Sequence, residues 1–62
     1  MNNAEKARIY DECVRESDTL QRENSRIKSE HVGNIPPELQ KIIDRNNNRI
    51  AVLVGKLENL FK

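Results

Sequence analysis

The sequence has no tryptophan, and one tyrosine and one phenylalanine make aromatic residues only 3% of the chain. Its single cysteine, Cys13, cannot form a disulfide within the chain, so we expect a reducing compartment. The scarcity of aromatic side chains leaves almost nothing on which nucleic-acid bases could stack. These absences argue against a disulfide-stabilised domain and against binding of single strands by stacking.

Long hydrophobic runs are also missing. No stretch approaches the roughly 20 apolar residues that a membrane-spanning helix requires. The N-terminal segment MNNAEKARIYDE contains no apolar run of the kind found in signal peptides. We therefore expect a cytoplasmic protein, of a cell or of a host infected by a virus or phage, that does not bind a membrane.

Charge of one sign does not dominate either. The chain has 11 basic and 10 acidic residues and a net charge of +1, so bulk charge directs it toward neither nucleic acid nor membrane. Apolar residues make up 35% of only 62 residues, and a chain of this size forms a marginal core. We expect one domain, residues 1–62, that gains stability from a second copy or another protein.

No group of residues suggests catalysis, a cofactor or a metal ion. His31 is the only histidine and has no accompanying ligand pattern, so we expect it to be structural or exposed. Cys13 is expected to pack as a small apolar side chain. The glutamates Glu16, Glu23 and Glu30 form a column that we expect to be solvated and ion-paired. Because two helices alone form no water-excluding pocket, we expect a non-enzymatic protein without a small-molecule substrate.

Residues 37–61 carry the clearest pattern in the chain. Core positions recur at alternating steps of four and three, the spacing of a helix that packs against another helix. They are Leu39, Ile43, Asn46, Ile50, Leu53, Leu57 and Leu60. One of these positions is polar, Asn46.

Residues 3–31 are predicted to form a first helix with few apolar residues. Asn2 is a suitable N-cap, with Glu5 three residues later. We expect ion pairs along its surface: Glu5–Arg8, Glu12–Arg15, Glu23–Arg26, Asp11–Arg15 and Asp18–Arg22.

Residues 32–36 are predicted to be a turn. Gly33 suits the left-handed position after a helix, and Pro37 suits the first position of the next helix. The fold class is therefore all-α, an antiparallel two-helix hairpin that resembles a coiled coil.

The polar core positions predict how the helices align. Placing Asn24 opposite Asn46 lets the two side chains satisfy each other and brings apolar residues together in most other layers. On one flank this register pairs Glu23 with Arg49 and Glu16 with Lys56. We predict that Asn24 and Asn46 set the register.

The opposite flank is apolar near both termini, where Ala7, Val14, Val54 and Phe61 face one another in this register. On a lone hairpin these side chains would be exposed, and exposed apolar patches usually mark an interface. We expect this surface to mediate self-association into a four-helix bundle, or to dock another protein. The expected function is protein interaction or assembly, as an adaptor, regulator or inhibitor.

The second helix also supports an alternative function. Lys41, Arg45, Arg49 and Lys56 lie along one side of it, and such a face could bind RNA or DNA. This alternative is a helical-bundle regulator that binds nucleic acid, and the pairing of Arg49 and Lys56 with glutamates weighs against it.

Overall fold

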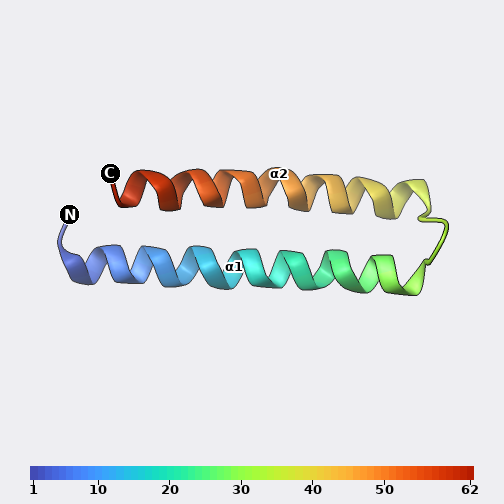
Figure 1. The fold of residues 1–62 in the computed structure, drawn as a ribbon, viewed down its shortest axis with the longest axis horizontal. Helices are drawn as coiled ribbons and strands as arrows, with labels where there is room; N and C mark the ends of the chain where they lie inside the picture. Colours follow the sequence, from blue (N-terminus) through green and yellow to red (C-terminus); the bar gives the residue numbers. More distant parts are fainter.

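A computed structural model describes all 62 residues as two α-helices and no strands. Helix α1 spans Asn3–Glu30 and α2 spans Pro37–Leu60, and they run antiparallel with both termini at one end (Figure 1). The hairpin measures 46 × 15 × 13 Å. The predicted all-α hairpin is confirmed, whereas its association into a four-helix bundle stays a prediction.

The N-terminus of α1 is capped by a side chain. The Oδ1 atom of Asn2 accepts a hydrogen bond from the backbone N–H of Glu5 at 2.8 Å, and the Asn2 carbonyl accepts from Lys6 at 3.1 Å. These bonds satisfy N–H groups that the first turn of a helix leaves free. At the other end α1 stops at Glu30, and His31 is its C-cap.

Gly33 and Pro37 take the positions in the turn that the sequence predicts for them. Gly33 has a φ of 87°, a backbone conformation that residues with a Cβ atom rarely adopt. Pro36 is extended, with φ −58° and ψ 147°, and Pro37 begins α2, where its missing N–H costs nothing. The Pro36 carbonyl accepts from Leu39 and Gln40 at 3.0 and 2.9 Å, which closes the first turn of α2.

The core is a single seam between the helices. The residues that are buried in it are Cys13, Ile27, Ile43, Leu53 and Leu60, together with the polar Asn24 and Asn46. The predicted core residues Leu39, Ile50 and Leu57 are only half-buried, as is Leu20 of α1, because a two-helix seam covers each of these side chains from one direction. One face of each helix therefore stays open to further packing.

The surface of α1 carries fewer ion pairs than expected. Asp11 pairs with Arg15 at 3.0 Å and Asp18 with Arg22 at 2.9 Å, as predicted, and Arg26 lies 3.9 Å from Glu30. The three pairs expected at a spacing of three residues do not form. Because these side chains are well exposed, the pairs contribute little to stability.

Candidate interaction surfaces

The polar layer of the core is a chain of hydrogen bonds that crosses the helix interface. The Nδ2 atom of Asn46 donates to Oδ1 of Asn24 at 2.9 Å and to Oε1 of Glu23 at 2.6 Å. Asn24 in turn donates from Nδ2 to Oδ1 of Asn47 at 3.0 Å. No buried side-chain nitrogen or oxygen atom in the chain lacks a partner. The structure thus brings Asn24 and Asn46 together without leaving a buried polar atom unsatisfied. Their role in setting the register stays a prediction.

Sequence reasoning did not assign Glu23 and Asn47 to this layer. Glu23 precedes Asn24 and Asn47 follows Asn46, so each lies at the edge of the seam beside a buried asparagine. A buried primary amide has two donors and an acceptor that takes two bonds, and its partner amide alone cannot satisfy all of them. These remaining hydrogen-bonding groups were the sign, already present in the sequence, that a neighbouring polar side chain would bind the buried amides.

The charged flank differs from its predicted pairing. Arg49 binds Glu16 through two hydrogen bonds, from Nε to Oε2 at 2.5 Å and from an Nη atom to Oε1 at 3.0 Å. The predicted pairs Glu23–Arg49 and Glu16–Lys56 do not form. Glu23 is already bound to Asn46, and the long Arg49 side chain instead reaches the carboxylate one heptad nearer the start of α1.

This ion pair shifts both of its titratable groups. The hydrogen bond from Arg49 lowers the pKa of the Glu16 carboxyl below its usual value, and the positive charges of Arg49 and Lys56 act in the same direction. The same hydrogen bond raises the pKa of Arg49. The pair therefore holds both groups charged across the neutral range.

The apolar flank lies at the end of the hairpin that carries both termini, where α1 begins and α2 ends (Figure 1). Val14, Val54 and Phe61 are 41%, 45% and 67% exposed, and Ala7 is also exposed. Tyr10 is 47% exposed and meets Phe61 edge-on, with ring centroids 6.0 Å apart and planes inclined at 68°. We call these five residues the open-end patch.

The two aromatic rings leave a hollow beside them. Its volume is about 460 Å³, and the residues that line it are Asn3, Lys6, Ala7, Tyr10 and Phe61. Two of the four residues predicted for the association surface, Ala7 and Phe61, therefore border one depression. An apolar side chain of a partner would contact three apolar side chains there, those of Ala7, Tyr10 and Phe61.

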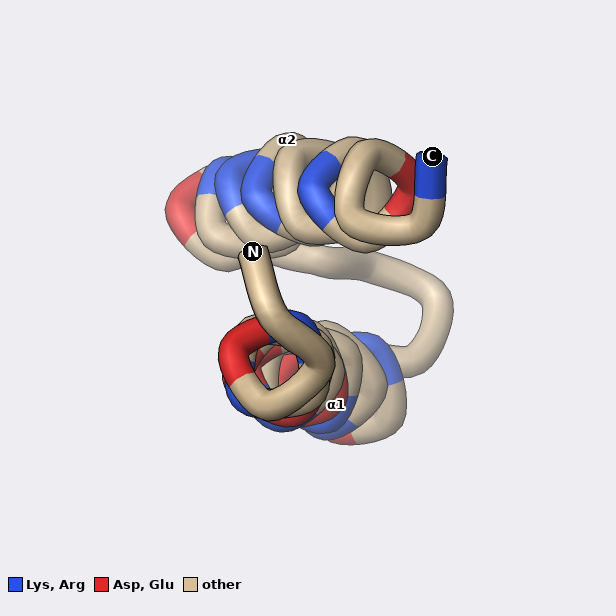
Figure 2. Tube along the Cα trace, turned by 90° about the vertical axis from the view of Figure 1, so that its left-hand side faces the viewer, with Lys and Arg blue, Asp and Glu red and all other residues tan.

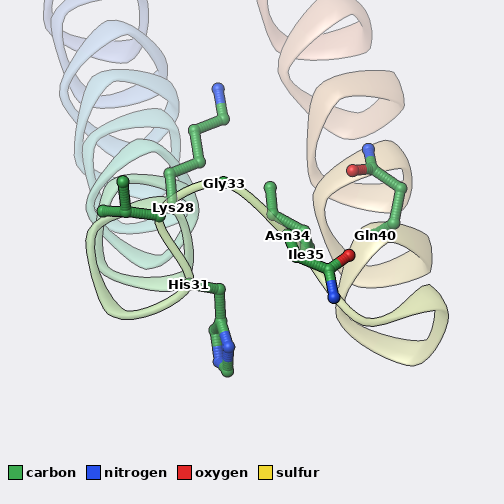
Figure 3. Close-up of a pocket in the computed structure, with 7 residues that line it drawn as sticks. Lys28, His31, Gly33, Asn34, Ile35 and Gln40 are labelled. Carbon is green, nitrogen blue, oxygen red and sulfur yellow. The ribbon is translucent and has the colours of Figure 1, made fainter.

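A second hollow, of about 500 Å³, lies at the turn. Figure 3 shows that the polar ends of Lys28, His31 and Gln40 point in different directions, with the His31 ring turned away from the other two. A ligand site needs polar groups that converge on one point. The turn therefore does not present such a site, and His31 is half-buried as the helix cap.

The basic side chains of α2 form an extended row. Figure 2 shows Lys and Arg recurring along this helix. Of Lys41, Arg45, Arg49 and Lys56, only Arg49 has an ion-pair partner in the chain. All four are exposed, and the structure does not gather them around a pocket.

Neither helix combines the length and the apolar character that crossing a membrane requires. No three His, Cys, Asp or Glu side chains lie close enough to hold a metal ion.

Comparison with protein-family models, with curated proteins and with solved structures finds no match to this chain.

Proposed function

We propose that this chain is a small, non-enzymatic interaction protein that acts through helix–helix contacts made by its open-end patch. The observation that carries this proposal is the position of the exposed apolar side chains. Four large ones, Tyr10, Val14, Val54 and Phe61, lie at the same end of the hairpin, and each is at least 41% exposed. Scattered single apolar residues need no explanation, but a contiguous patch usually marks a binding surface.

The small core supports the same proposal. Only seven of 62 residues are buried, which is little apolar burial to offset the entropy of ordering the chain. Covering Phe61 and its neighbours with a partner would remove further apolar area from water. Each large apolar side chain contributes about 1.5–3 kcal/mol when it becomes fully buried.

The shape of the patch suits a helix as the partner element. It is made by residues one helical turn apart on α1, Ala7, Tyr10 and Val14, and by Val54 and Phe61 on α2. A shallow trough between two antiparallel helices accepts the apolar stripe of a third helix, as helix-in-groove recognition does elsewhere. In this role the chain would act as an adaptor, regulator or inhibitor of another helical protein.

The test is site-specific photocrosslinking in the organism that makes the protein. A photoreactive amino acid at Phe61 is expected to give a discrete crosslinked product that survives nuclease treatment. The same amino acid at Asn48, exposed on the outer side of α2, is the control. Equal products at both positions, or none at position 61, would contradict the proposal.

Nucleic-acid binding is a second candidate function, supported by one observation. Lys41, Arg45 and Lys56 have no ion-pair partner and lie on the same helix. If they contact phosphates, binding should weaken steeply with salt and be lost in a Lys41→Ala/Arg45→Ala variant. Arg15→Ala/Arg22→Ala is the control, since both arginines are already paired with aspartates. Gel-shift titration at several salt concentrations measures both effects.

A further inference from the structure

We propose that a second copy of this chain occupies the open-end patch, with the twofold axis parallel to the helices. Helix α1 of each copy then lies against α2 of the other, and both turns lie at the same end of a four-helix bundle. This inference rests on the proposed function and goes further, because it names the occupant and its orientation.

The face that carries the patch has two unlike halves. Steps of seven residues lead from the apolar pair Ala7 and Val14 to Gln21 and Lys28 on α1, and from Phe61 and Val54 to Asn47 and Gln40 on α2. The half near the termini is therefore apolar and the half near the turn is polar. A copy that lies on this face along its full length with its turn reversed would cover apolar side chains with amides and a lysine. The parallel copy places the apolar half on the apolar half and the polar half, three amides and a lysine, on the polar half.

The size of the face favours contact along its full length. A stable protein interface buries about 800 Å² on each partner. The broad face of the hairpin measures 46 × 15 Å, roughly 690 Å² in projection, and a corrugated surface exceeds its projection. Two copies that overlapped only by their apolar ends would use about half of it. The parallel dimer alone both matches the apolar halves and approaches the required area.

The opposite face of the hairpin is less suited to a second copy. It carries the Glu16–Arg49 ion pair, the hydrogen bond from Asn46 to Glu23 and the charged Lys56, which has no ion-pair partner. Covering that ion pair would remove two charges from water, and the loss of hydration opposes association. The patch face carries no ion pair between its helices, so less opposes its burial.

Charges at the edge of the patch face distinguish this arrangement from others. Asp11 lies three residues before Val14, and Glu58 lies three before Phe61, so both border the patch. Asp11 is 13 residues before Asn24 and Glu58 is 12 after Asn46, which places them at nearly the same height along the hairpin. In the parallel dimer, Asp11 of one copy therefore lies near Glu58 of the other, and the two repel each other to the extent that Arg15, the ion-pair partner of Asp11, does not offset its charge. Reversing one of these charges should tighten the dimer.

The first measurement is sedimentation equilibrium of the full chain. We expect a dimer at roughly micromolar concentration, with a Kd that rises at least about a hundredfold in Val54→Ala/Phe61→Ala. The control is Val32→Ala/Val52→Ala, which truncates two valines of 86% and 50% exposure outside the patch, and its Kd should stay within about twofold. Glu58→Lys should lower the Kd severalfold. A folded wild-type monomer at roughly millimolar concentration, or an equal loss of dimer in both double variants, would overturn the inference.

The second measurement determines the orientation. A spin label on a keto amino acid at Asn34 leaves the buried Cys13 unmodified. Neighbouring helices in a bundle lie about 10 Å apart, so the two labelled turns of a parallel dimer should be within about 30 Å of each other. In a dimer that overlaps only by its apolar ends, the turns would be farther apart than the 46 Å length of one hairpin. Such a long distance in pulsed electron resonance would overturn the proposed arrangement.

Failure of this inference can be separated from failure of the proposed function. A wild-type monomer whose position 61 still crosslinks to another protein overturns only the second copy as occupant. A monomer that crosslinks to nothing overturns both. A parallel dimer whose crosslink at position 61 joins two copies of the chain supports both, with self-assembly as the helix–helix contact.

Discussion

The side chains of Asn24 and Asn46 meet in the core of the hairpin, where Nδ2 of Asn46 donates to Oδ1 of Asn24 at 2.9 Å. Both residues are almost fully buried, at 6% and 3% exposure. Each also binds a residue at the edge of the seam, Asn47 or Glu23. The two buried amides form these hydrogen bonds in only one alignment of the helices, so other alignments are disfavoured.

Replacing one member of this pair should destabilise the hairpin. Asn46→Leu leaves Oδ1 of Asn24 buried without its donor, and an unsatisfied buried polar atom costs about 1–3 kcal/mol. Asn48→Leu, on the exposed side of the same helix, is the control and should have little effect. Urea unfolding measures both.

Replacing both members should restore stability but weaken the choice of register. In Asn24→Leu/Asn46→Leu no buried amide remains, while Glu23 and Asn47 can turn to water. The double variant should be more stable than the sum of its single changes predicts. Additive effects would show that the two side chains are not coupled, in contradiction to the hydrogen bond between them.

The Glu16–Arg49 pair should make stability depend on pH in the acid range. Because the folded-state pKa of Glu16 is lowered, its contribution is present above the unfolded-state value of about 4.5 and is lost as the pH falls through the folded-state value. Wild type should therefore lose stability below about pH 4.5 more steeply than Glu16→Gln. The two unfolding curves should converge at lower pH. Glu12→Gln, which removes an unpaired glutamate, should keep the wild-type slope.

The two glycines should respond to alanine in opposite directions. Gly33 has a φ of 87°, and a left-handed conformation costs an L-residue about 1–2 kcal/mol, so Gly33→Ala should lower the free energy of unfolding. Gly55 lies inside α2, and apart from its own chain neighbours and the adjacent helix backbone no atom lies within 4 Å of an added Cβ. Gly55→Ala should therefore stabilise the helix by about 0.8–1 kcal/mol. Thermal or urea unfolding of both variants tests the prediction, and a stabilised Gly33→Ala chain would contradict the turn geometry.

Adjacent positions on α2 should differ sharply in their tolerance of truncation. Leu53 is the most deeply buried side chain, at 1% exposure, and Leu53→Ala should cost about 2–5 kcal/mol. Val52 is 50% exposed, and Val52→Ala should change stability by less than about 0.5 kcal/mol. Loss of the helical circular-dichroism signal in the first variant alone is the expected outcome.

Much of the fold could be read from local chemistry. Gly33, Pro36 and Pro37 exclude a continuous helix because of their backbone preferences, and Asn2 caps α1 with its own side chain. The four-three spacing of apolar residues identifies the buried stripe of α2, because a helix repeats every 3.6 residues. These properties depend on residues close together in the sequence, and for that reason the sequence by itself determined them.

The tertiary structure alone decided which side chains became partners at the edges of the seam. Glu16 and Glu23 lie on the same flank of α1, and spacing cannot tell which of them Arg49 binds; the outcome depends on Asn46 having already engaged Glu23. The contact of Tyr10 with Phe61 was likewise not visible in the sequence, since the two rings meet beside the seam instead of within it. Flexible side chains at the edge of an interface choose among several nearby groups, and that competition is resolved only when both helices are in place.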